Sequence, residues 1–287
     1  MTDEIIERVT RDMAQTIKGM TREEARYMVS SYYTAQDHRK RADNQARALE
    51  QAGAASEVVR WYADQSRRLE SQIAKTLDWW TEATTLGGWA RSIRGVGPVI
   101  TAGMMAHIDV SRAPTAGAVW RYAGLDPTQS WNKGHMRPWN AQLKTMAWLL
   151  GESFVKAGQS SYYNRLYRER KASEQRRNEA GEYREQALAK AEKVGKNTDA
   201  YRYYSAGVLS PGHIHERAKR WTVKIFLAHY HEAAYYVEYG SLPPRPYILE
   251  HGGHAHELAP PCVECIDGWA EARAAQGRPV EATAEAA

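Results

Sequence analysis

The sequence is poor in cysteine and phenylalanine, and it contains no long hydrophobic run. Only Cys262 and Cys265 occur among its 287 residues, so a small scaffold held together by several disulfides is excluded. Without a run of about 18 uncharged apolar residues, a membrane-spanning helix is excluded as well. The acidic start, Met1–Glu4, leads into no apolar segment of the secretory type. We therefore expect a cytoplasmic protein with reduced cysteines.

Acidic residues are scarce in the middle of the chain. The net charge is +5, from 39 Lys and Arg against 34 Asp and Glu. Residues 91–150 contain 7 basic and 2 acidic side chains, whereas residues 1–90 contain 13 basic and 14 acidic side chains. A basic centre of this kind favours a polyanionic partner such as DNA, although it is also found on ordinary solvated surfaces.

Strand patterns are rare, and apolar residues recur mostly at helical spacing, so we expect a mainly α fold. Thr21 and Glu24 fit a capping box that begins a polar helix, and Gly53 ends it. The apolar positions from Val59 to Trp80 predict a second helix. Together they predict an N-terminal helical hairpin over 22–85, which we interpret as an arm for packing or for forming a homo-oligomer.

The remaining sequence predicts further helices and a different C-terminal end. Residues 162–204 predict a long exposed helix followed by a loop, and residues 214–239 predict an apolar core helix. The prolines at 243–246 end helical order. The predicted divisions are a helical arm at 1–85, a helix-hairpin-helix module at 86–160, a basic and aromatic helical region at 161–245, a His/Cys-rich segment at 246–268 and a disordered tail at 269–287.

The most informative segment is Gly95-Val96-Gly97-Pro98. The two glycines allow a tight turn, and Pro98 suits the first position of the next helix. The free amides of such a turn, together with the positive helix end, can bind a phosphate. The segment predicts a helix-hairpin-helix that contacts the DNA backbone with little regard to sequence. The alternative is a turn that only connects two packed helices.

Two later segments extend this pattern, Tyr122-Ala123-Gly124-Leu125-Asp126-Pro127 and Trp139-Asn140-Ala141-Gln142-Leu143-Lys144. With the glycine turn, they resemble the carboxy-terminal transposase domain of the IS110/IS116/IS902 family over about residues 85–158. The resemblance implies a DNA-binding domain in a protein of phage or mobile-element type. In that family a RuvC-like domain with acidic metal ligands comes first. Here the first 90 residues predict helices instead, so the resemblance implies a DNA-binding half without the catalytic domain.

The resemblance also implies a nucleophilic serine in the loop after Tyr122–Pro127, and Ser130 falls about one position early. No base is identified beside Ser130, and an unactivated serine is a poor nucleophile. We therefore expect a non-catalytic DNA-binding protein. One alternative is a divergent transposase, recombinase or nuclease that uses Ser130 or the histidines at 213, 215, 229 and 231. The other is a structural or assembly protein with a relic DNA-binding module.

The predicted DNA contacts combine main-chain amides, basic side chains and one aromatic ring. Trp131 is expected to stack on an exposed base, and its alternative is burial in the core. The full predicted set is Arg94, Gly95, Val96, Gly97, Arg112, Trp131, Lys133, Arg137 and Lys144, with Arg217 and Arg220 extending the track.

A second cluster near the C-terminal end predicts a metal site. Cys262 and Cys265 form a Cys-x-x-Cys pair, and His254 and His256 precede it. Two thiolates and two imidazoles complete a closed tetrahedral zinc site of the structural type. The alternatives are two reduced surface thiols and a redox Cys-x-x-Cys pair.

Overall fold

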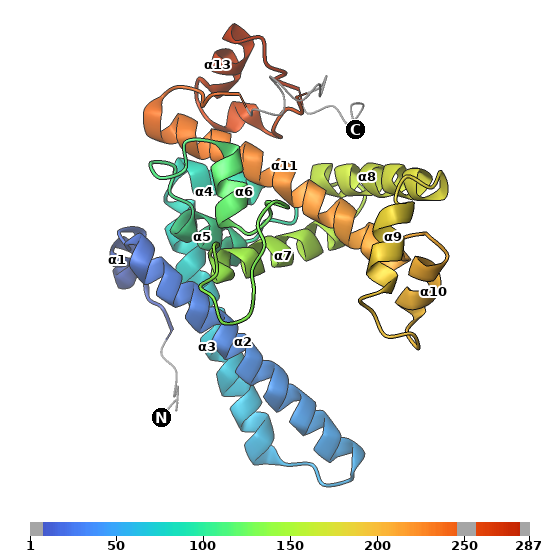
Figure 1. Cartoon of the computed structure of the whole chain (residues 1–287). Helices are drawn as coiled ribbons and strands as arrows, with labels where there is room; N and C mark the ends of the chain where they lie inside the picture. The colour runs from blue at the N-terminus through green and yellow to red at the C-terminus, as the bar shows by residue number, and fades with distance from the viewer. Residues whose placement is uncertain (1–7, 246–256, 282–287) are drawn as a thin grey trace. The chain divides into compact units, whose positions relative to one another are not determined.

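The computed structural model describes residues 8–245 and 257–281, and Figure 1 shows its helices. In this described part, all regular secondary structure is helical, which confirms the predicted mainly α class. The chain divides into two compact units. Unit 1 consists of residues 1–92 and 96–112, and unit 2 of residues 93–95 and 113–287. None of the described helices combines the length and apolarity needed to cross a bilayer.

Unit 1 is built around two long helices that run antiparallel (Figure 1). The first starts at the predicted capping box, where the Glu24 amide donates to Thr21 Oγ1 at 3.2 Å and the Thr21 amide donates to Glu24 Oε2 at 2.7 Å. The elements of unit 1 are η1 (Arg11–Met13), α1 (Ala14–Lys18), α2 (Arg22–Gln51), α3 (Glu57–Glu82), α4 (Thr85–Ser92) and α5 (Pro98–His107).

The α2–α3 pair is held by a narrow apolar seam and a polar bridge. The buried residues of α2 are small, Ala25, Val29, Ala35 and Ala42, and those of α3 include the larger Ile73, Leu77 and Trp80. Small residues on one helix let the larger side chains of the other pack closely. Partway along the pair, Arg39 Nε donates to the buried carboxylate of Glu70 at 2.5 Å. The sequence pattern over 22–85 therefore produces the antiparallel pair it predicts.

Unit 2 is organised around the long helix α11, which contacts α6, α7 and α8. Ser210 caps the start of α11, Pro211 is its first residue, and Gly240 with φ of 64° ends it. Phe154 of α7 stacks on Tyr163 of α8 with ring centroids 4.6 Å apart. The elements are α6 (Ala116–Tyr122), α7 (Ala141–Lys156), α8 (Tyr162–Glu179), α9 (Arg184–Ala191), α10 (Asp199–Ser205), α11 (Pro211–Tyr239), η2 (Val263–Cys265) and α13 (Trp269–Ala275).

Residues 162–204 differ from the predicted exposed helix and loop. The first turns of α8 are buried through Tyr162, Tyr163, Leu166 and Tyr167. Where a loop was expected, α9 and α10 fold against the start of α11. A small core holds them, formed by Tyr183, Ala187, Tyr204, Leu209 and Ile214. The prediction was wrong because these tyrosines are core residues, whose rings are buried while their hydroxyls keep hydrogen-bond partners.

The predicted disordered tail is also helical in part. Trp269 and Arg273 of α13 are both fully buried. Their common partner is Glu232 of α11, which accepts a hydrogen bond from Trp269 Nε1 at 3.0 Å and pairs with Arg273 and Arg278. The Ala/Glu-rich composition of this segment does not indicate that Trp269 and Arg273 are buried. Two such residues are enough to hold a short helix against a buried carboxylate, and they barely change the overall composition. Residues 282–287 of the predicted tail lie outside the described residues.

Candidate nucleic-acid interface

The glycine turn joins α4 to α5 with its apolar side chains inward, Gly95 half-buried and Gly97 at the surface. Gly97 is the N-cap of α5, and Pro98 occupies the first turn of that helix as predicted. Ile93 and Val96 are buried, whereas Arg94 and Gly97 are exposed. Gly95 has a φ of 100°, a conformation that suits glycine. Gly95 is half-buried, so the turn is open to solvent mainly on the Gly97 side of the buried valine.

The carbonyls of the turn are occupied by the protein. Ser153 Oγ donates to the Gly95 carbonyl at 2.5 Å, and Ser161 Oγ donates to the Arg94 carbonyl at 3.2 Å. Within the described part of the chain, no hydrogen bond is donated by the amides of Gly95 and Gly97. Two main-chain donors at the start of α5 are thus available to an anion.

The two glycines are required for different reasons. A Cβ at Gly95 would lie 3.2 Å from Ala157 Cβ and 3.3 Å from Phe154 Cδ1. A Cβ at Gly97 would meet nothing within 4 Å, and the φ of Gly97 is an ordinary −83°. Neither packing nor backbone conformation therefore demands glycine at position 97. The missing side chain instead leaves open space next to the start of α5.

The loop after α6 is anchored at its base. Gly124 has a φ of 65°, and a Cβ there would lie 2.8 Å from Trp139 Cγ. The Asn140 amide donates to the Tyr122 carbonyl at 2.9 Å, which closes the loop. Asp126 accepts bonds from the amide and the hydroxyl of Thr128 at 2.9 and 2.7 Å. The intervening residues 127–138 are therefore held between fixed ends.

In the described part of unit 2, five cations lie over tryptophan rings. Two of them, Arg170 and Lys219, also pair with carboxylates, and we call the other three the cation–tryptophan pairs. Arg137 Cζ is 5.1 Å from the Trp131 ring centroid, Lys144 Nζ is 3.9 Å from that of Trp139, and Lys224 Nζ is 4.4 Å from that of Trp120. Trp131 is 37% exposed, and its Nε1 donates to the His135 carbonyl at 2.6 Å. Trp131 is therefore a surface ring rather than a core residue.

Two cations of these pairs, Arg137 and Lys144, are close enough to interact. Burial lowers the pKa of Lys144, and the positive charges of Arg137 and Arg220 lower it further. Burial also lowers the pKa of Lys224, while the carboxylate of Asp126 acts in the opposite direction. Neighbouring cations that repel one another create a positive potential that attracts an anionic partner.

The other predicted basic contacts fall into two groups. Lys133 and Arg220 are exposed in unit 2, and Arg112 is exposed in unit 1. Arg94 is also exposed, with its guanidinium bonded to Ser160 Oγ. None of these four has an ion pair with a carboxylate within the described residues.

Arg217 differs from the predicted track because it is committed to the interior. Its Nε donates to Glu174 Oε2 at 2.7 Å, and its guanidinium lies 4.4 Å from the Tyr183 ring centroid. Glu174 is only 1% exposed, so losing this partner would leave a buried charge uncompensated. Arg220 is three residues further along α11 and is exposed. Arg217 is thus half-buried and paired, whereas Arg220 is exposed.

Ser130 is exposed, and no hydrogen bond in the described part of the chain joins its hydroxyl to a histidine or a carboxylate. The α11 histidines have structural partners. His229 Nδ1 accepts from the Tyr163 hydroxyl at 2.8 Å, and His229 Nε2 donates to the Leu258 carbonyl at 2.9 Å. Burial and then the charge of Arg273 lower the pKa of His229 to about 3, against the opposing bond to Leu258. His231 Nε2 similarly bonds the Ala113 carbonyl at 2.7 Å.

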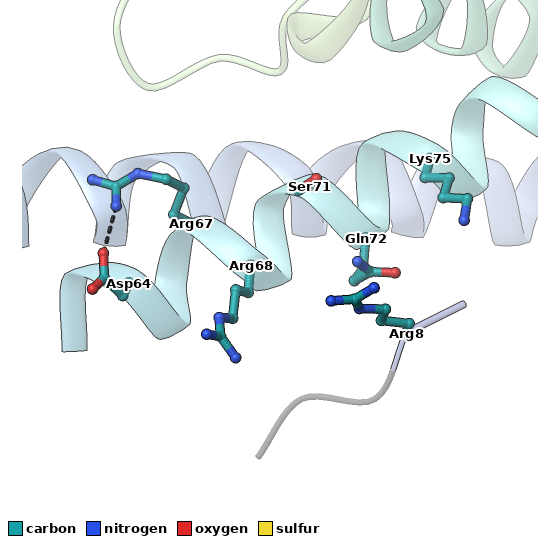
Figure 2. Close-up of a pocket in the computed structure, with 7 residues that line it drawn as sticks. All are labelled: Arg8, Asp64, Arg67, Arg68, Ser71, Gln72 and Lys75. Atoms are coloured by element: carbon teal, nitrogen blue, oxygen red, sulfur yellow. Dashed lines mark hydrogen bonds and ion pairs between the residues drawn. The ribbon is translucent and has the colours of Figure 1, made fainter. Parts of the chain in front are cut away.

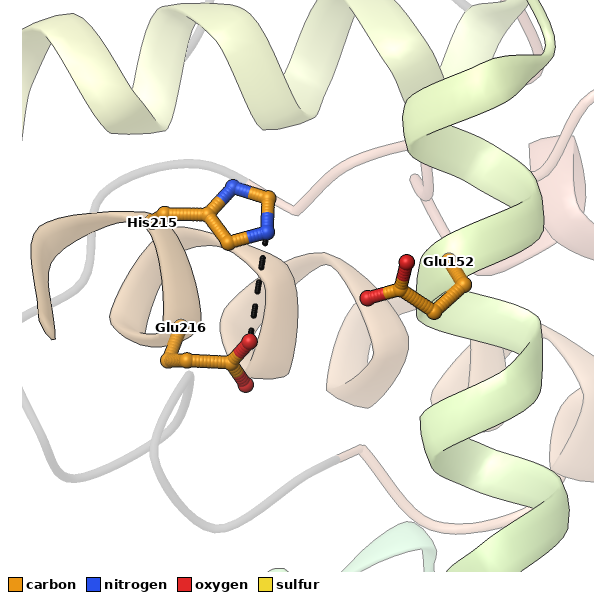
Figure 3. Close-up of side chains that lie close together, drawn as sticks. All are labelled: Glu152, His215 and Glu216. Atoms are coloured by element: carbon orange, nitrogen blue, oxygen red, sulfur yellow. Dashed lines mark ion pairs between the residues drawn. The ribbon is translucent and has the colours of Figure 1, made fainter. Parts of the chain in front are cut away.

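Glu152, His215 and Glu216 form the one described group of side chains spaced for a metal ion (Figure 3). The buried ammonium of Lys219 already lies against it, donating to Glu216 Oε1 at 2.6 Å and to Glu152 Oε1. Burial lowers the pKa of Lys219, but its bonds to the two carboxylates outweigh burial and raise it. The lysine therefore stays charged and takes the place that a cation would fill.

Cys262 and Cys265 are bonded to each other in the structure, whereas the sequence predicts reduced thiols. Cys262 has a φ of 56°, and the turn it forms brings the two Cα atoms to 5.3 Å, within the usual range for a disulfide. Zinc requires thiolates, so the disulfide form does not supply these two ligands. The other two predicted ligands, His254 and His256, lie outside the described residues. The zinc site stays a prediction for the reduced chain.

Comparison with known families now assigns the centre of the chain. Residues 89–138 match the family described as Transposase IS116/IS110/IS902 family. This segment is an IS110-family transposase domain. It runs from α4 through the glycine turn, α5 and α6 into the loop that carries Trp131 and Arg137. The protein is thus related to transposition. No curated protein and no solved structure matches the chain.

The IS110-family segment ends before part of the candidate interface. Lys144, Arg220 and Lys224 lie outside residues 89–138. Sequence reasoning included Lys224 in the basic stripe of 217–224 but missed its pairing with Trp120. The two residues are 104 positions apart yet joined by a hydrogen bond from Trp120 Nε1 to the Lys224 carbonyl at 2.9 Å. The signal available was a surplus of tryptophan, 10 in all, in a chain with 2 phenylalanines.

Proposed function

We propose that this chain is a non-catalytic DNA-binding protein of phage or mobile-element type. The observation that carries the proposal is the set of cation–tryptophan pairs on unit 2, in which Arg137 lies close enough to Lys144 to lower its pKa. The IS110-family match supports DNA as the partner. In a helix-hairpin-helix, a backbone phosphate approaches the start of the second helix. The open space beside Gly97 leaves room for such an approach.

Each part of the interface has a role in this proposal. The amides of Gly95 and Gly97 donate to a phosphate, and Lys133, Arg137 and Lys144 neutralise others. Trp131 offers its exposed ring face to an unpaired base. Because these groups recognise the backbone and any base face, they bind with little sequence preference.

A salt titration tests the proposal. Labelled linear, forked and four-way DNA would be titrated with the protein between about 50 and 200 mM salt, where phosphate-dominated binding weakens steeply. Lys133→Ala and Arg137→Ala should each reduce the slope of log K against log salt by about one. Arg177→Ala is the matched control, because Arg177 pairs with Glu182 at 2.6 Å. Absent or salt-independent binding contradicts the proposal.

We also propose that the α2–α3 arm self-associates. Four apolar side chains of α3 are exposed, Val58, Trp61, Tyr62 and Leu69, at 73, 49, 47 and 43%. Their spacing of three, four and seven residues places them on one side of the helix, as in a coiled-coil seam. Apolar side chains exposed in a row along one side of a helix are typical of a protein interface.

A further inference from the structure

Helix α3 also carries a basic surface pocket, shown in Figure 2. The α3 residues that line it include Arg67, Arg68, Ser71, Gln72 and Lys75, and Arg8 lies beside them from the N-terminal segment. The pocket belongs to unit 1 and lies entirely outside residues 89–138. Neither the family match nor the candidate interface therefore accounts for it.

The pocket runs along one face of the helix. Its α3 residues recur at intervals of three and four, which places them on a single side. From Asp64 to Lys75 this face extends about 16 Å along the axis. The N-terminal segment is fixed on the same face, because the Val9 amide donates to Gln72 Oε1 at 2.8 Å. The N-terminal segment therefore contributes Arg8 to one side of the pocket.

The pocket has a surplus of positive charge. Among the described residues that line it, Arg8, Arg67, Arg68 and Lys75 are basic and Asp64 is the one carboxylate. The charge of Asp64 is compensated by Arg67, which forms ion pairs with Asp64 at 2.5 Å and with Asp43 at 2.9 Å. Arg68 and Lys75 are exposed, and neither pairs with a carboxylate of the described chain. The ammonium of Lys75 is 4.7 Å from the Trp79 ring centroid.

The adjacent pocket of the same hairpin shows that this surplus is local. There Arg47, Arg60 and Arg67 face three carboxylates, Asp43, Glu50 and Asp64. Arg60 pairs with Glu50 at 2.5 Å. The charges in that pocket balance, so an anion gains little by binding there. Of these two pockets, only the one around Arg68 and Lys75 has basic side chains in excess of carboxylates among its described residues, so it is the better site for an external anion.

We propose that this pocket binds phosphate groups of the DNA backbone and forms a second contact on the arm. The inference rests on the proposed function, since it takes DNA to be the partner. Arg68 and Lys75 are seven residues apart, about 10 Å along the helix, so they would contact separate phosphates of one strand, whose charges recur about every 3.4 Å of rise. The hydroxyl of Ser71 lies between them and supplies a neutral hydrogen-bond donor.

The test compares two variants of the full chain. Arg68→Ala/Lys75→Ala removes the two cations, and Arg60→Ala removes an exposed arginine of α3 from the balanced pocket. Binding of a labelled duplex of about 30 base pairs would be followed by fluorescence anisotropy in a salt series. We expect the double variant to bind about tenfold more weakly or worse at about 0.1 M salt, with a salt slope lower by about two. Arg60→Ala should stay within about twofold, and circular dichroism should report equal helicity for all.

The outcomes separate this inference from the proposed function. If the double variant binds like the unchanged chain while Lys133→Ala and Arg137→Ala weaken binding, the pocket assignment fails and the proposed function stands. If the unchanged chain does not bind DNA, both fail. Inorganic tripolyphosphate, titrated by calorimetry, tests the other source of phosphate. Tripolyphosphate binding that needs Arg68 and Lys75, with DNA affinity unaffected by them, also overturns the DNA assignment.

Discussion

At the residue scale, Gly95 and Gly97 allow folding and binding to be tested separately. Gly95→Ala forces a left-handed φ onto a residue with a side chain and presses its Cβ against Phe154 and Ala157. We expect a loss of about 1–2 kcal/mol in the free energy of unfolding, measured by denaturant titration. Gly97→Ala should leave this free energy within about 0.5 kcal/mol, since its Cβ points into open space.

The same pair of variants reports on phosphate approach. A methyl group at position 97 occupies the space beside the α5 amides, so Gly97→Ala should weaken DNA binding about fivefold or more without loss of stability. That comparison uses the anisotropy titration at one salt concentration. Unchanged affinity of the Gly97→Ala variant would show that no phosphate lies against this turn.

Glu174 is a buried carboxylate with three partner side chains. Burial acts to raise the pKa of Glu174, but hydrogen bonds from Arg217, Tyr183 and Arg170 outweigh it and lower the pKa to about 2. The ordinary value is 4.5, so the unfolded chain takes up this proton first as the pH falls. The stabilisation is therefore complete above about pH 4.5 and is lost as the pH falls toward 2.

Replacing this carboxylate should change how stability depends on pH. At pH 7 we expect Glu174→Gln to lower the free energy of unfolding by about 3 kcal/mol, because the arginines lose their counter-charge. The deficit should shrink between pH 4.5 and 2, as measured by urea titrations across that range. Glu179→Gln, in the same helix but exposed, is the control and should have little effect at any pH. A deficit that is constant with pH would contradict the assigned pKa.

At the scale of the element, the loop at 123–140 places one aromatic ring where a base can reach it. We expect Trp131→Ala to weaken binding of single-stranded DNA about tenfold, in line with the loss of one stacked base. Duplex binding should change less, because paired bases do not expose their faces. Trp131→Phe keeps a ring and should recover most of the affinity. Equal losses for both kinds of DNA would argue against stacking.

Helices could be predicted from the sequence where a short local pattern specifies them. The capping box at Thr21 and Glu24 and the apolar spacing of α3 and α11 specify those helices directly. The burial of Tyr163 or Trp269 depends on partners far along the chain or outside its own element, Phe154 and Glu232, which no local pattern shows.

The same division holds for the candidate site. Turn chemistry indicated Gly95, Gly97 and Pro98, because a tight turn into a helix has a local signature. The commitment of Arg217 to Glu174 and the contact of Lys224 with Trp120 join residues on different helices. Such pairings are decided by how the helices pack, so they required the folded chain.

At the scale of the whole molecule, the exposed apolar side chains of α3 bear on the oligomeric state. We expect light scattering to give the mass of a dimer or a larger homo-oligomer for the full chain. Trp61→Glu/Leu69→Glu should shift this mass toward that of the single chain, because charged residues in such a seam resist pairing. The control is Arg60→Ala, which leaves the apolar side chains in place. A single-chain mass for the unmodified protein would exclude self-association through the arm.

One helix, α3, carries a buried seam, an exposed apolar row and a basic pocket; the row continues the side of the seam, and the pocket lies on the other side. Each additional residue rotates the rest of the helix by about 100°, so one inserted amino acid near Gln65 would set all three surfaces out of register at once. About seven inserted residues complete nearly two turns and restore every alignment. Variation in the length of this arm among related chains is therefore expected in steps of about seven, while single-residue changes of length are expected to be rare.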